Sequence, residues 1–230
     1  YEEAPAAQEM EVAVPHVEEA PAAPLAMPEE FADAPSADEA SDQTIRQAPV
    51  VREPAAPVQG EGGVLPLEQS YVDAVKKLCE ERDWLLLADE VQTGVGRTGK
   101  LFAFQQYDLL PDVCSFAKGI AGGMPMSGIM ANEKCRNVLG PGTHATTFGG
   151  NPVACAGAVS IVERLSDAFL AEVEAKSAYV REALSGAEGI EGLSGMGLMV
   201  GIKTKAPAAD VVRACIERGV LCLTAKDKVR

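Results

Sequence analysis

Histidine, paired cysteines and long apolar runs are the features that this sequence has little of. It has two histidines, and none of its six cysteines lie in a C-x-x-C pair, so we expect no metal site. No apolar run approaches the ~20 residues that a membrane-spanning helix needs, and the acidic start at Tyr1 has no signal-peptide character. Cysteines within apolar runs, such as Cys114 and Cys222, are typical of buried free thiols. We therefore expect a cytoplasmic protein with no membrane partner, because free thiols persist in a reducing compartment.

Basic residues are also in short supply, and the shortage is concentrated at one end of the chain. Lys and Arg number 20 against 34 Asp and Glu, which gives a net charge of −14. Up to Glu53, 13 acidic residues stand against Arg46 and Arg52 alone. Since the remainder is nearly neutral, neither part offers the clustered cations with which proteins bind nucleic acid. With nine of the 15 prolines and no apolar period, residues 1–57 are predicted to be a disordered, acidic, Pro/Ala/Glu-rich tail.

Downstream of this tail, helical and extended patterns alternate. Short apolar runs predict strands, and apolar residues at helical spacing predict helices. The alternation indicates an α/β fold with a sheet that is mainly parallel in its first part. The predicted strands are 84–88, 112–117, 126–131, 198–203 and 220–224, and the predicted helices are 67–83, 152–165, 168–184 and 208–218.

Two chemically active side chains follow the first two predicted strands. Asp89 comes directly after Leu-Leu-Leu-Ala, and Lys118 follows Cys-Ser-Phe-Ala. Ligands of open α/β sheets gather at the carboxyl ends of the strands, so the two side chains can face one crevice. A desolvated lysine there is a nucleophile toward carbonyl groups, because burial lowers the pKa of the amine. The alternative is a salt bridge, or two separately solvated strand ends.

Two further polar segments have more than one interpretation. Gly94-Val-Gly-Arg-Thr-Gly99 matches G-x-G-x-x-G, but it does not follow its strand directly and no helix signal opens at its third glycine. We therefore interpret it as a mobile glycine loop. Residues 144–152 combine hydroxyls, glycines and a proline, which is typical of an anion-binding turn. They also suit a simple helix start with Asn151 as N-cap and Pro152 at the first position, and both interpretations can hold.

Four segments together resemble the class III, ornithine-type, pyridoxal phosphate (PLP)-dependent aminotransferases. They match that class in order and spacing over residues 56–230, and they are VQGEGGV at 58–64, LADEVQTGVGRTG at 87–99, FAKG at 116–119 and TTFGGNP at 146–152. Within the class, the segments at 99–103, 117–119 and 223–225 resemble the acetylornithine aminotransferases most. The resemblance implies the fold type I of PLP-dependent transferases. Residues 58–165 would form part of the PLP-binding large domain, and residues 166–230 part of a small C-terminal α+β domain.

The resemblance also implies a role for four cofactor-binding residues. Lys118 would hold PLP as a Schiff base and afterwards move the proton at the substrate. Asp89 would pair with the pyridinium nitrogen, and Gln92 would hydrogen-bond the phenolic oxygen of the ring. Thr147 would bind the phosphate of the cofactor in the neighbouring subunit, which implies a homodimer with shared sites.

Two residues are implied at the substrate. Arg230 falls where the class grips the substrate α-carboxylate, a task suited to the planar fork of arginine. Glu61 matches the acid that pairs with this arginine when a substrate does not present its α-carboxylate there. The implied substrates are small amino acids and 2-oxo acids. The implied reaction, a step of arginine biosynthesis, converts N-acetylornithine and 2-oxoglutarate to N-acetylglutamate 5-semialdehyde and glutamate.

The chain also departs from the class. Residues 1–57 contain no counterpart of the phosphate-binding turn and stacking aromatic that the class carries upstream, and a glycine usual in the class is Lys226 here. We therefore expect the fragment alone to bind PLP weakly or not at all and to be inactive. Ornithine, succinylornithine and succinyldiaminopimelate transaminases remain alternatives for the substrate. A non-catalytic interaction fragment remains an alternative for the whole chain.

Overall fold

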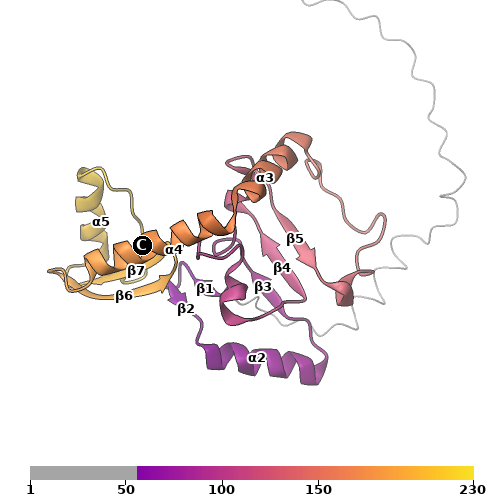
Figure 1. The fold of residues 1–230 in the computed structure, drawn as a ribbon, viewed down its shortest axis with the longest axis horizontal. Helices are drawn as coiled ribbons and strands as arrows, with labels where there is room; N and C mark the ends of the chain where they lie inside the picture. The colour runs from indigo at the N-terminus through magenta and orange to yellow at the C-terminus, as the bar shows by residue number, and fades with distance from the viewer. Residues whose placement is uncertain (1–55) are drawn as a thin grey trace, which may run out of the picture. The chain divides into compact units, whose positions relative to one another are not determined.

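The computed structural model describes residues 56–230, and the expected tail lies outside this range except for its last two residues (Figure 1). Within the range, short strands and helices alternate as the sequence predicts. The strands form a two-stranded, a three-stranded and a four-stranded sheet. The helices are α2 (Gln69–Arg82), α3 (Pro152–Arg164), α4 (Asp167–Leu184) and α5 (Ala208–Glu217).

The three-stranded sheet contains the two strands that precede Asp89 and Lys118. Its order is β3 (Leu87–Asp89), β4 (Val113–Phe116) and β5 (Gly128–Ala131). β3 and β4 are parallel, so their carboxyl ends share one edge as predicted. β5 runs antiparallel to β4, which corrects the expectation of a mainly parallel sheet. The connection between β4 and β5 contains only the 3-10 turn Lys118–Ala121, whereas a parallel return is usually made by an α-helix that crosses the sheet.

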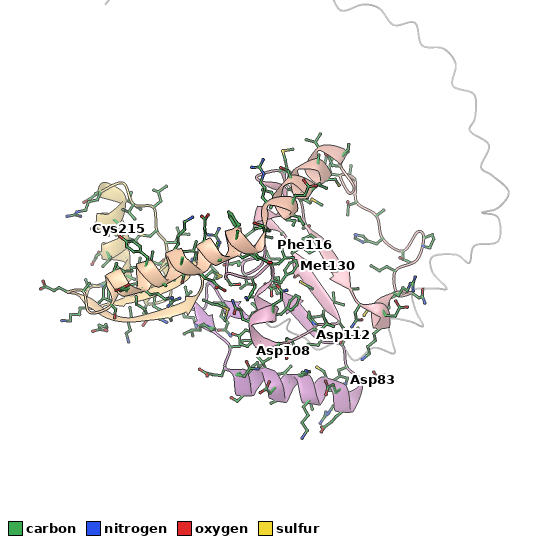
Figure 2. All side chains as sticks on the ribbon, viewed as in Figure 1. Asp83, Asp108, Asp112, Phe116, Met130 and Cys215 are labelled. Atoms are coloured by element: carbon green, nitrogen blue, oxygen red, sulfur yellow. The ribbon has the colours of Figure 1, made fainter. Side chains whose placement is uncertain are left out.

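A glycine lets β4 and β5 pack closely where they pair. Gly128 lies opposite Phe116 in the register of the two strands. A Cβ at Gly128 would lie 2.6 Å from the Phe116 ring, so this position has no room for a side chain. In Figure 2, Phe116 and Met130 mark β4 and β5 among the side chains of the sheet. The Phe116 ring also packs against Phe102 at a centroid distance of 6.4 Å, which joins the sheet to the loop that follows β3.

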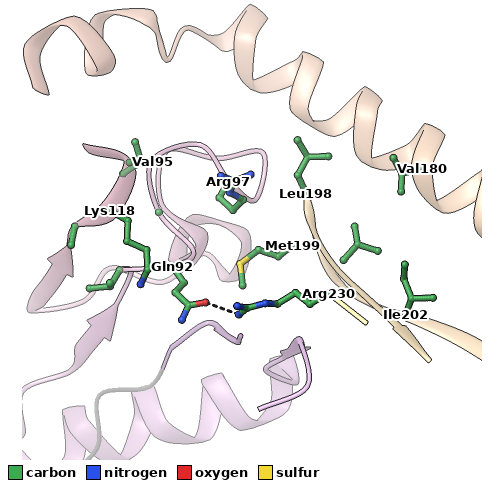
Figure 3. Close-up of a pocket in the computed structure, with 14 residues that line it drawn as sticks. Gln92, Val95, Arg97, Lys118, Val180, Leu198, Met199, Ile202 and Arg230 are labelled. Atoms are coloured by element: carbon green, nitrogen blue, oxygen red, sulfur yellow. Dashed lines mark hydrogen bonds between the residues drawn. The ribbon is translucent and has the colours of Figure 1, made fainter. Parts of the chain in front are cut away.

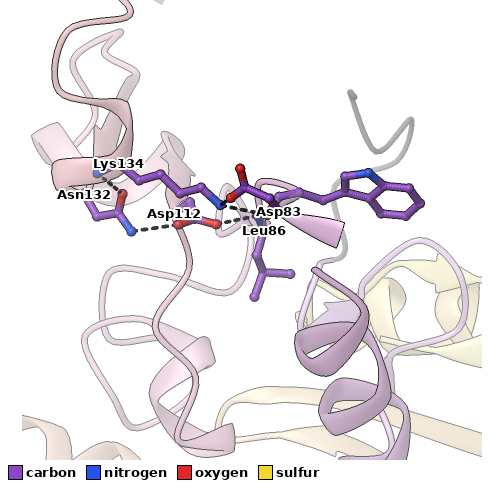
Figure 4. A network of polar contacts seen from close by, with 6 residues as sticks. Asp83, Leu86, Asp112, Asn132 and Lys134 are labelled. Atoms are coloured by element: carbon purple, nitrogen blue, oxygen red, sulfur yellow. Dashed lines mark hydrogen bonds and ion pairs between the residues drawn. The ribbon is translucent and has the colours of Figure 1, made fainter. Parts of the chain in front are cut away.

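A polar network around Asp112 holds the starts of β3 and β4 together (Figure 4). The Asp112 carboxylate accepts hydrogen bonds from the Leu86 backbone at 2.7 Å and from Asn132 Nδ2 at 2.8 Å. Lys134 Nζ forms an ion pair with Asp83 at 2.8 Å, and Asp83 ends α2 in a left-handed conformation. The network therefore connects α2, β3, β4 and the end of β5. Its bonds to Leu86 lie outside the strand itself, because β3 begins only at Leu87 rather than at residue 84 as predicted.

The four-stranded sheet follows α4 in the chain and is antiparallel throughout. Its order is β6 (Ile190–Met196), β7 (Met199–Thr204), β9 (Lys228–Val229) and β8 (Thr224–Ala225). The sequence predicted β7 but missed β6, whose two glycines are unfavourable in strands. The strand predicted at 220–224 is wrong except for Thr224. Instead, α5 ends in a turn at Gly219 with φ +82°, and Leu221 is 88% exposed.

Helix starts and buried cysteines follow local sequence signals. Asn151 Oδ1 accepts from the backbone of Val153 and Ala154, and Pro152 is the first residue of α3, so the predicted helix start is confirmed.

All six cysteines are free; Cys114 is buried as expected, whereas Cys222 is only half-buried. Burial raises the pKa of the Cys114 thiol to about 12. Cys222 escapes full burial because both its neighbours in the chain face outward.

A small apolar cluster joins β1 (Val58–Gln59) and β2 (Leu65–Pro66) to the four-stranded sheet. Val58 and Val64 are fully buried against Met199 of β7 and Ala225 of β8. Val64 adopts a left-handed conformation with φ 53° at the end of the loop between β1 and β2. This packing fixes the loop that carries Glu61.

Candidate functional site

A cavity of about 440 Å³ opens where the loops after β3 and β4 meet β7 (Figure 3). Its volume lies in the range typical of small-molecule sites. Parts of the chain that are distant in sequence form its wall. The lining residues are Val91, Gln92, Gly94, Val95, Arg97, Ala117, Lys118, Gly119, Val180, Leu198, Met199, Val200, Ile202 and Arg230.

Lys118 lines this cavity two residues beyond the end of β4. Its backbone is left-handed, with φ 51°, and the preceding Ala117 is extended. Such a conformation is uncommon for a residue with a side chain, and it is found where tertiary structure imposes it, often at functional sites. Within residues 56–230 the Lys118 ammonium group has no ion-pair partner. In Figure 3 the Lys118 side chain extends toward Gln92.

Asp89 ends β3 at the same edge of the sheet but is not among the residues that line the cavity. Its Oδ1 accepts hydrogen bonds from the Val91 backbone at 3.0 Å and from Ser115 Oγ at 3.2 Å. Within the described range no hydrogen bond reaches Oδ2, so one carboxylate oxygen is available to a ligand. Asp89 and Lys118 form no ion pair with one another, which removes the salt-bridge alternative for this structure. The two residues follow neighbouring parallel strands at one sheet edge, but only Lys118 lines the cavity, so a shared crevice and both roles stay predictions.

Glu90 is a residue whose importance the sequence analysis missed. The side chain is fully buried, accepts a hydrogen bond from the Thr93 hydroxyl, and accepts another from the Phe104 backbone at 2.7 Å. Burial raises the pKa of the Glu90 carboxyl, and these hydrogen bonds oppose the rise. The bonds close the turn between Asp89 and Gln92, so Glu90 positions the two predicted cofactor ligands. Nothing in the apolar pattern distinguishes it from an exposed acid.

The predicted substrate residues Glu61 and Arg230 meet, and Gln92 joins them. Arg230 Nη1 lies 2.8 Å from Glu61 Oε1 and donates to Gln92 Oε1 at 3.2 Å. The Arg230 side chain is 20% exposed and that of Glu61 is 69% exposed, so solvent screens the ion pair from one side. A Cβ at Gly60 would lie 2.3 Å from Gln92 Oε1, which shows how closely the loop passes the amide.

Thr147 is not brought to this cavity. It lies in the exposed stretch between β5 and α3, where Phe148 is 83% exposed. A residue that serves a neighbouring subunit has to face outward, so the location is compatible with the predicted role. That role stays a prediction.

Arg97 and the residues of β7 are lining residues that the sequence analysis did not identify. Arg97 lies within the Gly94–Gly99 segment, whose most prominent sequence feature is its glycine spacing. The segment is packed rather than free: Thr98 within it and Thr93 just before it are almost fully buried, and its turns contact α4 and the connection between β6 and β7. This packing argues against the mobile loop expected from sequence. The signal that was available is an arginine within a glycine-rich segment that follows the Asp89–Gln92 turn.

Two classes of site receive no support from the described part of the chain. No three His, Cys, Asp or Glu side chains between residues 56 and 230 gather in an arrangement that could hold a metal ion. None of the helices described is long and apolar enough to cross a membrane.

Comparison with known proteins gives a consistent family. The model of the family described as aminotransferase class-III matches residues 3–230, which extends upstream of residue 56, where we expected the resemblance to begin. Acetylornithine aminotransferase of Haemophilus ducreyi is 47% identical over 175 residues, which are 75% of this chain and 44% of that protein. The chain thus spans less than half the length of this relative.

Solved structures agree. N-acetylornithine aminotransferase of Stenotrophomonas maltophilia K279a is 32% identical with a TM-score of 0.67, over 76% of this chain and 48% of that one. Ornithine aminotransferase of Toxoplasma gondii, in which PLP partly occupies the active site, is 35% identical with a TM-score of 0.67, over 76% and 44%. Class III aminotransferases use PLP, and the fold is the fold type I of PLP-dependent transferases expected from sequence. The chain therefore belongs to the class III aminotransferase family.

Proposed function

We propose that this chain carries the lysine side of a PLP-dependent transaminase site centred on Lys118. The observation that carries the proposal is the left-handed Lys118 at the end of β4, lining one cavity with Gln92 and Arg230. The residues present fit the cofactor, which is a small anionic aldehyde. Within residues 56–230, the Lys118 amine has no ion-pair partner, and Asp89 Oδ2 accepts no hydrogen bond. When bound, PLP supplies an electron sink for negative charge at the substrate Cα.

Each side chain has a task that its contacts allow. Lys118 Nζ would hold the cofactor, and its amine would move a proton at the substrate Cα. Asp89 is held at the strand edge by Ser115 and Val91, and its carboxylate would keep a proton on the ring nitrogen. Gln92 Oε1 accepts from Arg230, which leaves the Nε2 amide to donate to the phenolic oxygen.

Arg230 binds the α-carboxylate of the substrate, and Glu61 competes for the same guanidinium. With the Glu61 pair closed, the site accepts a substrate that presents its far-end amine. With the pair open, it accepts glutamate or 2-oxoglutarate. The substrates we propose are N-acetylornithine and 2-oxoglutarate, supported by the motif resemblance and by the Haemophilus relative. Ornithine is the second candidate, because the Toxoplasma relative acts on it. Thr147 binding across a homodimer completes the proposal.

Selective labelling of Lys118 tests the central claim. The chain is incubated with excess PLP, reduced with borohydride, digested and analysed by mass spectrometry. We expect the pyridoxyl group to concentrate on the Lys118 peptide, and to be lost in Lys118→Arg. Lys100→Arg is the matched control, because Lys100 lies on the neighbouring loop but pairs with Glu174 at 3.7 Å. Labelling spread evenly over the lysines would overturn the assignment.

Complementation tests the activity and the substrate. The chain is assayed alone and co-expressed with the part of the Haemophilus relative that it does not match, using N-acetylornithine, ornithine and N-succinylornithine with 2-oxoglutarate. We expect the chain alone to be inactive. The pair should be active, with the highest kcat/KM for N-acetylornithine, and should lose activity in Lys118→Ala. If the pair is inactive and Lys118 is not labelled, the interaction-fragment alternative holds.

A further inference from the structure

We propose that Cys215 and Cys222 form a reversible disulfide under oxidising conditions, and that this bond restrains the segment that carries Arg230. Cys215, labelled in Figure 2, lies in α5, and Cys222 lies in the connection between α5 and β8. Both thiols are free, and both residues are half-buried. Neither residue lines the Lys118 cavity, so the proposal is separate from the chemistry of that cavity.

The two thiols already interact in the reduced chain. The Cys222 thiol donates a hydrogen bond to the Cys215 sulfur. Burial, followed by this hydrogen bond, raises the pKa of the Cys222 thiol, so Cys222 keeps the proton that it donates to Cys215. Sulfur atoms that share a hydrogen bond need only small side-chain movements to reach the geometry of a disulfide.

The turn at the end of α5 brings the two cysteines together. The Cys215 carbonyl oxygen accepts hydrogen bonds from the backbone of Arg218 at 3.0 Å and from that of Val220 at 2.9 Å. Gly219 allows the chain to reverse here, with φ 82°. Because these bonds fold the connection back on the last turn of α5, Cys222 returns to Cys215. Backbone hydrogen bonds therefore maintain the proximity of the two thiols.

The connection between α5 and β8 also leaves the pair accessible to a small oxidant. Residues 218–223 belong to no described helix or strand. Val220, Leu221 and Leu223 are exposed, so the side of the pair that this connection covers faces solvent. Three other cysteines are buried, and a reagent in solution should react with them more slowly; these are Cys79, Cys114 and Cys135.

The oxidant we propose is a small disulfide such as oxidised glutathione, and the exchange balances without another reagent. One cysteine thiolate attacks glutathione disulfide, forms a mixed disulfide and releases one glutathione thiolate. The thiolate of the neighbouring cysteine then attacks the mixed disulfide at the protein sulfur. This step closes the Cys215–Cys222 bond and releases the second glutathione. The two cysteines lose two electrons and two protons, and the two glutathione molecules gain them.

The disulfide acts on Arg230 through Leu223. The Leu223 amide donates to the Arg230 carbonyl at 2.9 Å, and the Arg230 amide donates to the Leu223 carbonyl at 2.7 Å. Cys222 directly precedes Leu223, so a bond from Cys222 to Cys215 anchors this backbone pair to α5. Oxidation should therefore slow the local opening of the segment that presents Arg230 to the cavity.

Simple packing of two small apolar side chains is the competing explanation. Free cysteines often fill gaps in a core as hydrophobic residues, without any redox role. Cys155 in α3 is the matched control, because it is free and half-buried like the pair. If packing alone explains the pair, oxidised glutathione should treat all three half-buried cysteines alike.

Peptide mapping tests the pairing in the wild-type chain. Trypsin cleaves after Arg213, Arg218 and Lys226, so the two cysteines fall on separate peptides, 214–218 and 219–226. The chain is equilibrated with oxidised glutathione, quenched with acid, digested and analysed by mass spectrometry. We expect these two peptides to be joined in about tenfold excess over any other pair of cysteine peptides, and to separate on reduction with dithiothreitol.

Variants and hydrogen exchange complete the test. Cys215→Ser should leave glutathione attached to Cys222, and Cys155→Ser should leave the joined peptides at the wild-type level. The Leu223 and Arg230 amides should exchange several-fold more slowly in the oxidised chain than in the reduced chain. Glutathione on both cysteines without joined peptides, or joining to Cys155 at an equal level, overturns the pairing even if a variant fails to fold. Joined peptides with unchanged amide exchange overturn the effect on Arg230.

Discussion

Gln92 Oε1 accepts a hydrogen bond from Arg230 Nη1 at 3.2 Å, although 138 residues separate the two in the chain. The same guanidinium nitrogen lies 2.8 Å from Glu61 Oε1. One arginine is therefore shared between an amide that faces the proposed cofactor and a carboxylate on the surface. Arg230 can therefore change partners, because the exposed Glu61 carboxylate can leave the guanidinium without breaking any buried contact.

We expect Glu61→Gln to tighten the binding of 2-oxoglutarate several-fold, because the Arg230 guanidinium loses its competing carboxylate. The free energy of unfolding should change by less than about 1 kcal/mol, since pairs with an exposed partner contribute little. Calorimetric titration and urea denaturation measure the two effects. Glu188→Gln, an exposed acid that has no ion pair in the described part of the chain, serves as the control. Weaker binding of 2-oxoglutarate by Glu61→Gln would contradict the competition.

The buried carboxyl group of Glu90 should make the free energy of unfolding depend on pH. Burial raises the pKa of its carboxyl, so the folded state binds the proton more tightly than the unfolded chain does. Its stabilising contribution is therefore complete below the usual carboxyl pKa of about 4.3, and it is lost as the pH rises through the raised value. Glu90→Gln should lack this part of the pH profile, because Oε1 can still accept from Phe104 while Nε2 donates to Thr93. Parallel urea-denaturation profiles of the two proteins between acidic and neutral pH would refute it.

A truncation at the same position measures the hydrogen bonds instead of the charge. We expect Glu90→Ala to lower the free energy of unfolding by about 2–6 kcal/mol at acidic pH, because two donors lose their acceptor, each at about 1–3 kcal/mol. The loss should be smaller at neutral pH, where the buried carboxylate of the wild type is charged. Urea denaturation of Glu90→Ala beside Glu90→Gln separates the two contributions. If both variants lose the same stability, the hydrogen bonds are not what positions this turn.

The network of Figure 4 predicts different outcomes for two aspartates. Asp112→Asn loses one of its two acceptor contacts, with Leu86 or with Asn132, so we expect a loss of about 1–2 kcal/mol. Asp108→Asn is the matched control, since Asp108 is exposed and left-handed with φ 48°, a conformation that asparagine tolerates well. Thermal and urea unfolding of both variants test the difference. Equal losses would show that the network does not hold the strand starts together.

Gly197→Ala should destabilise the chain more than the same substitution at another glycine with positive φ. Both Gly197 and Gly186 have positive φ, but a Cβ at Gly186 meets nothing within 4 Å. Gly186→Ala should therefore lower the free energy of unfolding only by about 1–2 kcal/mol, the cost of a left-handed backbone for a residue with a Cβ. Gly197→Ala adds a backbone clash of about 1–3 kcal/mol. Hydrogen exchange of the Leu198 amide, which donates to Arg97, should accelerate in Gly197→Ala alone. Equal exchange in both variants would argue against the proposed contact.

Local signals in the sequence determined much of the fold and part of the site. Short apolar runs located β3 and β4 and placed Asp89 and Lys118 at one sheet edge, because neighbouring parallel strands end together. Asn151 and Pro152 marked the start of α3, since capping depends only on adjacent residues. β6 was missed because its glycines weaken the pattern of an ordinary strand, and β5 was assigned without its reversed direction.

Tertiary structure alone decided which of these side chains share a cavity. Glu90 and Glu61 are both acids in short connecting segments, yet one is fully buried and the other mostly exposed. The sequence shows Arg97 only as a charged residue in a loop, whereas in the structure its backbone bonds to Leu198 and it lines the cavity. Periodicity and capping depend on neighbours in the chain, so the sequence determined the elements and the strand-end residues. Burial and charge pairing depend on partners that only folding brings together, as with Gln92, Glu61 and Arg230.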